Sequence, residues 1–159
     1  MRLGAAVLVA ACALASACAI GGPSTFVLTS ASVDPSFTCP VGAADVRYTI
    51  GATVNAENDT SGAVTIRSAA ARLKLVAVKG AWLESVGDTY DAAGVTFAPG
   101  TVAAGAKTNL KLTIPSSCSN GKPGTNSKSY GDYSVTIQLS TSAGSFSITS
   151  KDHHRIVAA

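Results

Sequence analysis

Apolar and polar residues alternate strictly along the segment Gly131–Ser140, GDYSVTIQLS. Its apolar side chains fall at every second position, at Tyr133, Val135, Ile137 and Leu139. Because successive side chains of a β-strand point to opposite faces, this pattern predicts a strand with one face on a core and the other in water.

Further segments of this kind run along the rest of the chain. We expect strands at Thr25–Val33, Val46–Val54, Val64–Val78, Val95–Phe97, Lys107–Ile114 and Ser145–Ser150, the last of them extending toward Arg155–Val157. In the second of these, Val46, Tyr48, Ile50, Ala52 and Val54 are expected to face inward.

Proline, glycine and small polar residues mark the connections between these strands. Asp34-Pro35 and Pro115 are expected to end strands, Asn55–Gly62 reads as a turn, and the Gly144 region as a tight turn before the last strand. Loops are expected between Pro35 and Pro40, which contains Cys39, and from Ser116 to the start of the Gly131 strand, which contains Cys118.

The Val64–Val78 segment changes phase in its middle. Val64 and Ile66 are apolar at even positions, whereas Ala71, Leu73 and Leu75 are apolar at odd ones. A uniform strand would place one of these sets in water, so we expect a bulge or corner near Arg67–Ala69. A short helix is the alternative, because Ala, Leu, Arg and Lys all favour helices. The alternation of charged with apolar residues favours a strand.

No sustained helical period occurs after the N-terminal segment. Short strands separated by turn signals, without helices between them, predict an antiparallel β-sandwich of seven to eight strands.

Three features carry a family resemblance. They are the inward Tyr133 two residues after Gly131, the preceding segment FAPGTVAAGAKTNLKLTI (97–114), and a final hairpin with a polar last strand. Together they resemble the immunoglobulin-like or fibronectin type III-like domains of bacterial surface proteins, over roughly residues 25–157. The cysteine pair and central tryptophan of antibody domains are not on their usual strands here. The resemblance therefore implies an architecture and does not imply a function.

The first 17 residues have the composition of an export signal. A basic start at Met1-Arg2 is followed by the unbroken apolar run Leu3–Leu14 and by the small residues Ala15-Ser16-Ala17. The run is short for a membrane span, which needs about 20 apolar residues, so retention as an anchor helix is the less favoured alternative. We expect residues 1–17 to be a signal peptide, 18–24 a short spacer and 25–159 one Ig-like domain.

Cys18 is a candidate for lipidation. The sequence LASAC, which ends at Cys18, resembles the bacterial lipobox, in which small residues precede a cysteine that receives a diacylglycerol. Ala15 stands where that family usually has leucine. The match at Cys12 is better, but it would leave an unusually short signal. Plain cleavage after Ala17 remains the alternative at Cys18.

Charge and length limit the possible partners. Once Arg2 is set aside, eleven of the 12 Lys and Arg residues remain against nine Asp and Glu, without a clustered basic run. This composition argues against nucleic acid as a partner. About 140 residues make one domain, which can bury a core without a metal.

Cys39 and Cys118 remain for the folded domain. Two cysteines in an exported chain predict one disulfide. An even number of antiparallel strands is expected between their loops, which would place both loops at the same end of the sandwich. Two buried free thiols are the alternative.

Catalytic and metal-binding patterns are scarce. His153 and His154 are the only histidines, and on a strand adjacent side chains point to opposite faces, so they are poorly placed to share a metal. The GxSxG pattern does not occur. The close carboxylate pairs, Asp88 with Asp91 and Glu57 with Asp59, lie in turn sequence, and neither segment has calcium-loop spacing. We therefore predict no catalytic residues, no metal and no cofactor.

Trp82, Tyr90 and Tyr130 are candidates for an aromatic binding platform. All three lie in or near predicted loops and could contact a sugar or a peptide. Their alternative role is partial cover of the core.

The favoured interpretation is a non-catalytic, exported Ig-like module, attached to the envelope by a lipid on Cys18 and otherwise secreted. Its role is then structural or in protein interaction. The second interpretation is an extracellular glycan- or peptide-binding protein that uses Trp82 and the loops opposite the disulfide, and an enzyme comes third.

Overall fold

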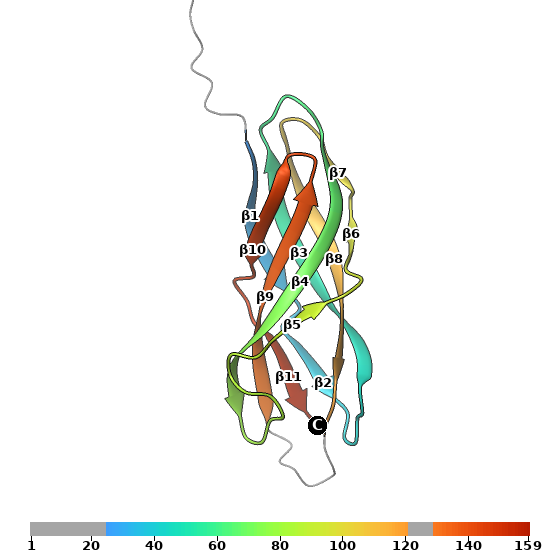
Figure 1. Cartoon of the computed structure of the whole chain (residues 1–159), viewed down its shortest axis with the longest axis vertical. Helices are drawn as coiled ribbons and strands as arrows, with labels where there is room; N and C mark the ends of the chain where they lie inside the picture. Colours follow the sequence, from blue (N-terminus) through green and yellow to red (C-terminus); the bar gives the residue numbers. More distant parts are fainter. Residues whose placement is uncertain (1–24, 121–128) are drawn as a thin grey trace, which may run out of the picture.

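The protein folds as two β-sheets packed face to face, as Figure 1 shows. This computed structural model describes residues 25–120 and 129–159, and the predicted signal peptide, Cys18 and the spacer lie outside those residues. Sheet order is β1-β3-β8-β6 in one layer and β2-β11-β9-β4-β5 in the other, where β10 also pairs with β9 and β7 with β4. The strands are β1 Phe26–Val33, β2 Ser36–Cys39, β3 Val46–Asn58, β4 Val64–Lys79, β5 Thr89–Ala92, β6 Thr96–Ala98, β7 Thr101–Val102, β8 Ala106–Cys118, β9 Tyr130–Thr141, β10 Gly144–Thr149 and β11 His154–Ala158.

The strand order is that of an immunoglobulin-like sandwich. In sequence, β1, β3, β8 and β6 correspond to strands A, B, E and D of one Ig sheet, and β11, β9 and β4 to G, F and C of the other. Every pair is antiparallel except β2 with β11. The all-β, antiparallel, Ig-like fold class predicted from the sequence is therefore confirmed.

The structure has more strands than expected because the first and last strands each divide. The chain leaves the first sheet after β1, passes Asp34-Pro35 and joins the second sheet as β2. At the other end of the chain, β10 pairs with Thr136–Thr141 of β9, and β11 pairs with Tyr130–Tyr133 of the same strand. The short strands β5 and β7 were also not predicted.

Strand β9 is central, as its alternation predicted. It lies between β4 on one edge and β10 with β11 on the other. Tyr133, Val135, Ile137 and Leu139 are all buried and form one wall of the core. Leu110, Leu112 and Ile114 of β8 are buried as predicted, and they contribute to the same core.

The phase change in β4 is a β-bulge, as predicted. Pairing with β9 shifts register between Ile66 and Ser68, and a second shift follows between Leu75 and Ala77. Val64 and Ile66 are buried before the first bulge, and Leu73 and Leu75 after it. The bulge thus keeps both halves of the strand on the core, and the helix alternative for this segment is wrong.

Three boundary predictions and one burial prediction were wrong. Ser36–Cys39 is strand β2 and not a loop, because Phe37 stacks on Tyr48 with a centroid distance of 3.9 Å and the backbone pairs with β11. Asn55–Asn58 continues β3, paired with β1 and β8.

Pro115 does not end β8, which runs on to Cys118. Pro115 pairs with Thr49 of β3, whereas β6 reaches β8 only at 111–113, so one side of the proline needs no ladder hydrogen bond. Val46, expected inward, is 36% exposed because it lies at the very start of β3.

Candidate functional site

The main candidate site is a cavity at the end of the sandwich where the disulfide lies. We call this end the disulfide end, and it is the lower end in Figure 1, near the C-terminus. The cavity has a volume of about 350 Å³. Its lining comes from the end of β2, the segment after β4, β5, the end of β8 and the residues after it, the start of β9 and β11. The lining residues are Cys39, Ala81, Trp82, Leu83, Glu84, Tyr90, Ser117, Cys118, Ser119, Asn120, Ser129, Tyr133, Ile156 and Ala158.

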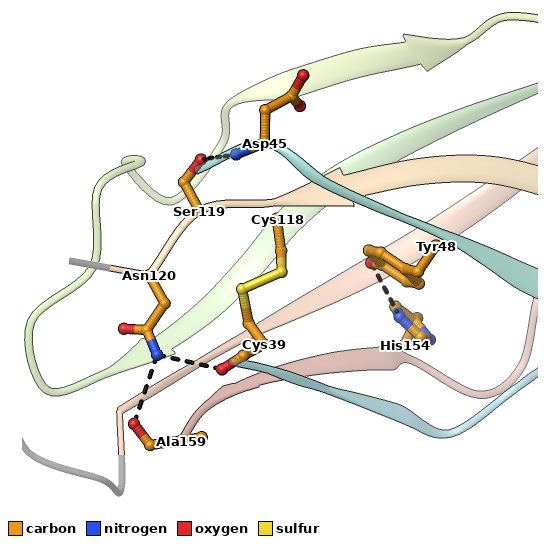
Figure 2. The surroundings of a disulfide bond; sticks show 8 residues. All are labelled: Cys39, Asp45, Tyr48, Cys118, Ser119, Asn120, His154 and Ala159. Carbon is orange, nitrogen blue, oxygen red and sulfur yellow. Dashed lines mark hydrogen bonds between the residues drawn. A yellow bond between two sulfur atoms is a disulfide. The ribbon is translucent and has the colours of Figure 1, made fainter. Parts of the chain in front are cut away.

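The disulfide itself joins the two sheets. Cys39 ends β2 in one sheet and Cys118 ends β8 in the other, with 6.0 Å between their Cα atoms, so the predicted pairing and its placement at a single end are confirmed. Figure 2 shows the buried Asn120 beside it, whose Nδ2 donates to the carbonyl oxygens of Cys39 (3.1 Å) and Ala159 (3.4 Å). These contacts hold the ends of β2, β8 and β11 together.

Trp82 closes the core next to the cavity. Its indole ring lies on Gly131, where a Cβ atom would come within 2.7 Å of the ring, so the close packing depends on glycine at this position. The indole Nε1 donates to the Tyr133 hydroxyl and to Glu84 Oε2, each at 3.1 Å. Trp82 is half-buried and therefore serves both as core cover and as cavity wall.

Glu84 and Tyr133 complete a small hydrogen-bonded group with Trp82. The Tyr133 hydroxyl donates to Glu84 Oε2 and accepts from the indole. Burial, reinforced by the hydrogen bond to the Glu84 carboxylate, raises the pKa of Tyr133 far above its usual value. The phenol therefore stays protonated, and the carboxylate is held by one oxygen at the cavity.

Tyr90 lies in the same cavity, whereas Tyr130 does not. The Tyr90 hydroxyl pairs with Ser116 Oγ at 3.1 Å, its ring meets Tyr133 edge to face at 6.1 Å, and burial raises its pKa. Tyr130 is outside the cavity lining and lies under the Arg155 guanidinium, 3.9 Å from its ring centroid. The three-aromatic platform is thus reduced to Trp82 and Tyr90.

The predicted position of the site relative to the disulfide was wrong. Trp82 and both cysteines line one cavity, so the site and the disulfide share an end of the sandwich. The reason is that β4 runs antiparallel to β9, which brings the residues after Lys79 next to Tyr130, at the disulfide end.

Glu84, Asn120 and Ser129 were not singled out from the sequence. Ser129 is 2% exposed, and its hydroxyl has no hydrogen-bond partner among the described residues. Of these three residues, only Glu84 carried a sequence signal for the site, because it is a carboxylate two positions after the only tryptophan. Asn120 and Ser129 flank residues 121–128 in a polar segment that contains no periodic pattern to mark them.

The remaining chemical candidates serve structural contacts. Asp91 forms a two-point ion pair with Arg72. Glu57 forms a single-contact ion pair with Lys107, at 2.9 Å through its Oε1. Within residues 25–120 and 129–159, histidine, cysteine and carboxylate side chains form no group of three or more that could hold a metal ion.

The two adjacent histidines have opposite environments, as the strand geometry predicted. His153 is exposed, whereas His154 is 1% exposed on β11. His154 Nδ1 donates to the Asp34 carbonyl oxygen at 2.8 Å. This leaves Nε2 to accept from the Tyr48 hydroxyl at 3.2 Å, the hydrogen bond drawn in Figure 2. The ring is therefore a neutral structural link between β11, β3 and the β1–β2 connection.

We expect stability to fall as the pH drops below the unfolded pKa of His154. Burial lowers the pKa of His154 in the folded state, so the unfolded chain binds a proton first. The contribution is complete above about pH 6.5, the ordinary value for histidine, and is lost as the pH falls toward the folded pKa. Urea unfolding at pH 7.5 and 5.5 should show this loss for the wild type and for His153→Gln, but not for His154→Gln. Equal pH dependence in all three would contradict it.

Comparison with known proteins assigns this chain to no family. No family model and no curated protein matches the sequence. Among solved structures, the human CEP192 ASH/PapD-like domain 7 matches at 14% identity over 99% of this chain and 96% of its own, with a TM-score of 0.31. AggA, the major subunit of aggregative adherence fimbriae type I of Escherichia coli, matches at 12% identity over 86% and 97%, with a TM-score of 0.34.

A third match is the Vibrio cholerae VesB protease, at 14% identity over 80% of this chain and 31% of the protease, with a TM-score of 0.26. All three scores are too low to carry an argument about function. The fold class is established here by the strand order. In addition, the residues that the structure describes include no helix that is long and apolar enough to cross a membrane.

Proposed function

We propose that the protein is a non-catalytic, exported Ig-like module, tethered to the bacterial envelope through a lipid on Cys18, with a structural or protein-interaction role. The observation that carries this proposal is the disulfide between the two sheets. Disulfides form and persist in oxidising compartments outside the cytosol. The signal-like N-terminal segment and the lipobox-like LASAC sequence support the same location.

The arrangement of the strands suits a tethered module. Strand β1 begins with Phe26 at one end of the sandwich, and β1 and β2 both run toward Cys39 at the other end, as Figure 1 shows. The described chain therefore starts at the end opposite the cavity. A tether that precedes β1 would leave the cavity facing away from the membrane.

Metabolic labelling with an alkyne fatty acid tests the tether. We expect label on the wild-type protein in the membrane fraction, no label on Cys18→Ser, and release of that variant from the membrane. Cys12→Ser, which removes the other cysteine of the N-terminal segment, is the matched control and should keep the label. An unlabelled wild type, or label that persists on Cys18→Ser, would refute lipidation at this position.

A second candidate function is extracellular binding of a peptide or glycan. The observation in its favour is the cavity of about 350 Å³, which has Trp82 and Tyr90 in its wall. Pockets of this size with aromatic walls and a few polar groups are the usual form of small-ligand sites.

A further inference from the structure

We propose that the cavity at the disulfide end receives a basic side chain, arginine in the first place, from a protein partner. This inference rests on the second candidate function, because it takes the cavity to be a binding site and names the class of its ligand. Three features of the lining support it: its charge, its apolar surface, and the way in which its polar groups are already used.

The charge of the described lining is negative. Glu84 is the only residue in it with a charged side chain at neutral pH, since the pKa values of Tyr90 and Tyr133 are both raised. Glu84 Oε2 accepts from Trp82 and Tyr133, which fixes the carboxylate, while Oε1 accepts no hydrogen bond from the described residues. A cation can donate to that oxygen in a charge-assisted hydrogen bond. Lys122 and Lys128 fall in segment 121–128, so this count covers the described lining alone.

The apolar part of the lining fits the stem and the planar head of arginine. Trp82 and Tyr90 present aromatic rings to the cavity, and Leu83 beside them is 80% exposed. A guanidinium near an aromatic ring gains cation–π attraction, and the methylene stem of arginine covers apolar surface while its head stays polar. Aromatic residues and arginine are also the side chains most often found at the centre of protein interfaces.

The polar groups of the lining favour this ligand over a neutral sugar. The nitrogen donors of Asn120 and Trp82 are already bonded within the protein. A sugar would find neither of these N–H donors free. A guanidinium brings its own donors and needs an acceptor, which Glu84 Oε1 provides.

The fluorescence of Trp82, the only tryptophan in the chain, reports directly on this cavity. The full-length protein with its disulfide intact is titrated with acetyl-Gly-Arg-Gly-amide, and with the citrulline analogue, which has the same shape without the charge. We expect a saturable change with the arginine peptide and at least tenfold weaker binding of the citrulline peptide. Chitobiose, a neutral disaccharide, should give no saturable change.

Two variants with the same change of charge test the role of Glu84. Glu84→Gln keeps a hydrogen-bond acceptor for Tyr133 and Trp82 but removes the charge. It should weaken binding of the arginine peptide at least tenfold. Glu57→Gln removes a carboxylate that pairs with Lys107, outside the cavity lining, and it should leave binding unchanged. Urea unfolding of both variants confirms that they are folded.

Each contrary result has a distinct meaning. Equal binding of the arginine and citrulline peptides, or unchanged binding by Glu84→Gln, would overturn the ligand class and leave the cavity as a binding site. Saturation by chitobiose alone would make it a glycan site. No saturation by any probe would overturn this inference together with the second candidate function, without bearing on lipidation of Cys18.

Discussion

Replacing Cys39 and Cys118 together by alanine should lower the free energy of unfolding by about 4 kcal/mol. The disulfide spans 79 positions of sequence, and in the chain-entropy account the cross-link restricts the unfolded chain by about this amount. In the folded protein the disulfide also holds the two sheets together, because it joins β2 of one sheet to β8 of the other. Urea unfolding followed by Trp82 fluorescence measures the change.

Reduction provides the control for this measurement. The wild-type protein under a reducing agent should unfold with a free energy close to that of the double alanine variant, because both lack the same cross-link. A loss of less than about 1 kcal/mol in the double variant would contradict the importance assigned to this bond, since a disulfide typically contributes about 2–4 kcal/mol.

Asn58→Asp should destabilise the fold by about 3 kcal/mol at neutral pH, an effect comparable to several lost hydrogen bonds to buried groups. Asn58 is fully buried, and its Nδ2 donates to the carbonyl oxygens of Gly62, Val102 and Ala103 at 2.9–3.0 Å. Its Oδ1 accepts from the amide and hydroxyl of Thr60. The side chain thus joins the β3–β4 turn to the β7–β8 turn, and a carboxylate would place negative charge against three carbonyl oxygens.

The pH dependence of this variant distinguishes charge from shape. Burial beside carbonyl oxygens should raise the folded pKa of the new carboxyl group, so the folded chain binds a proton more tightly than the unfolded one. The variant should therefore recover stability as the pH falls. Asn55→Asp is the matched control on the same strand, since Asn55 is partly exposed and its Nδ2 donates to a single hydroxyl, Ser30 Oγ. A cost at position 58 no greater than at position 55 would contradict this role for Asn58.

The features that could be predicted from sequence are those that follow from a face in contact with the core. The alternation around Val135 and Ile137 predicts β9, and the phase change after Ile66 predicts a bulge, because either segment would otherwise place apolar side chains in water. The pairing of Cys39 with Cys118 followed from the small number of cysteines and from the parity of the strands.

The features that could not be predicted depend on partners distant in sequence. Ser36–Cys39 is too short to show a period, and it is a strand because β11 lies beside it. Pro115 continues β8 because β6 stops short of it, which no local signal in β8 reveals.

The candidate site has the same limitation. Trp82 and Tyr90 could be proposed individually, but the grouping of Trp82 with Glu84 and Tyr133 depends on Gly131, which leaves room for the indole ring. The exclusion of Tyr130 also required the structure, which places it against Arg155 and outside the cavity lining.

The most direct test of an exported sandwich joined once between its sheets is the state of its thiols in protein taken from cells. The protein is denatured and alkylated with iodoacetamide before and after reduction, and peptides with Cys39 and Cys118 are examined by mass spectrometry. We predict that both cysteines stay unmodified before reduction and are both alkylated after it. Full alkylation of Cys39 and Cys118 without reduction would contradict the account.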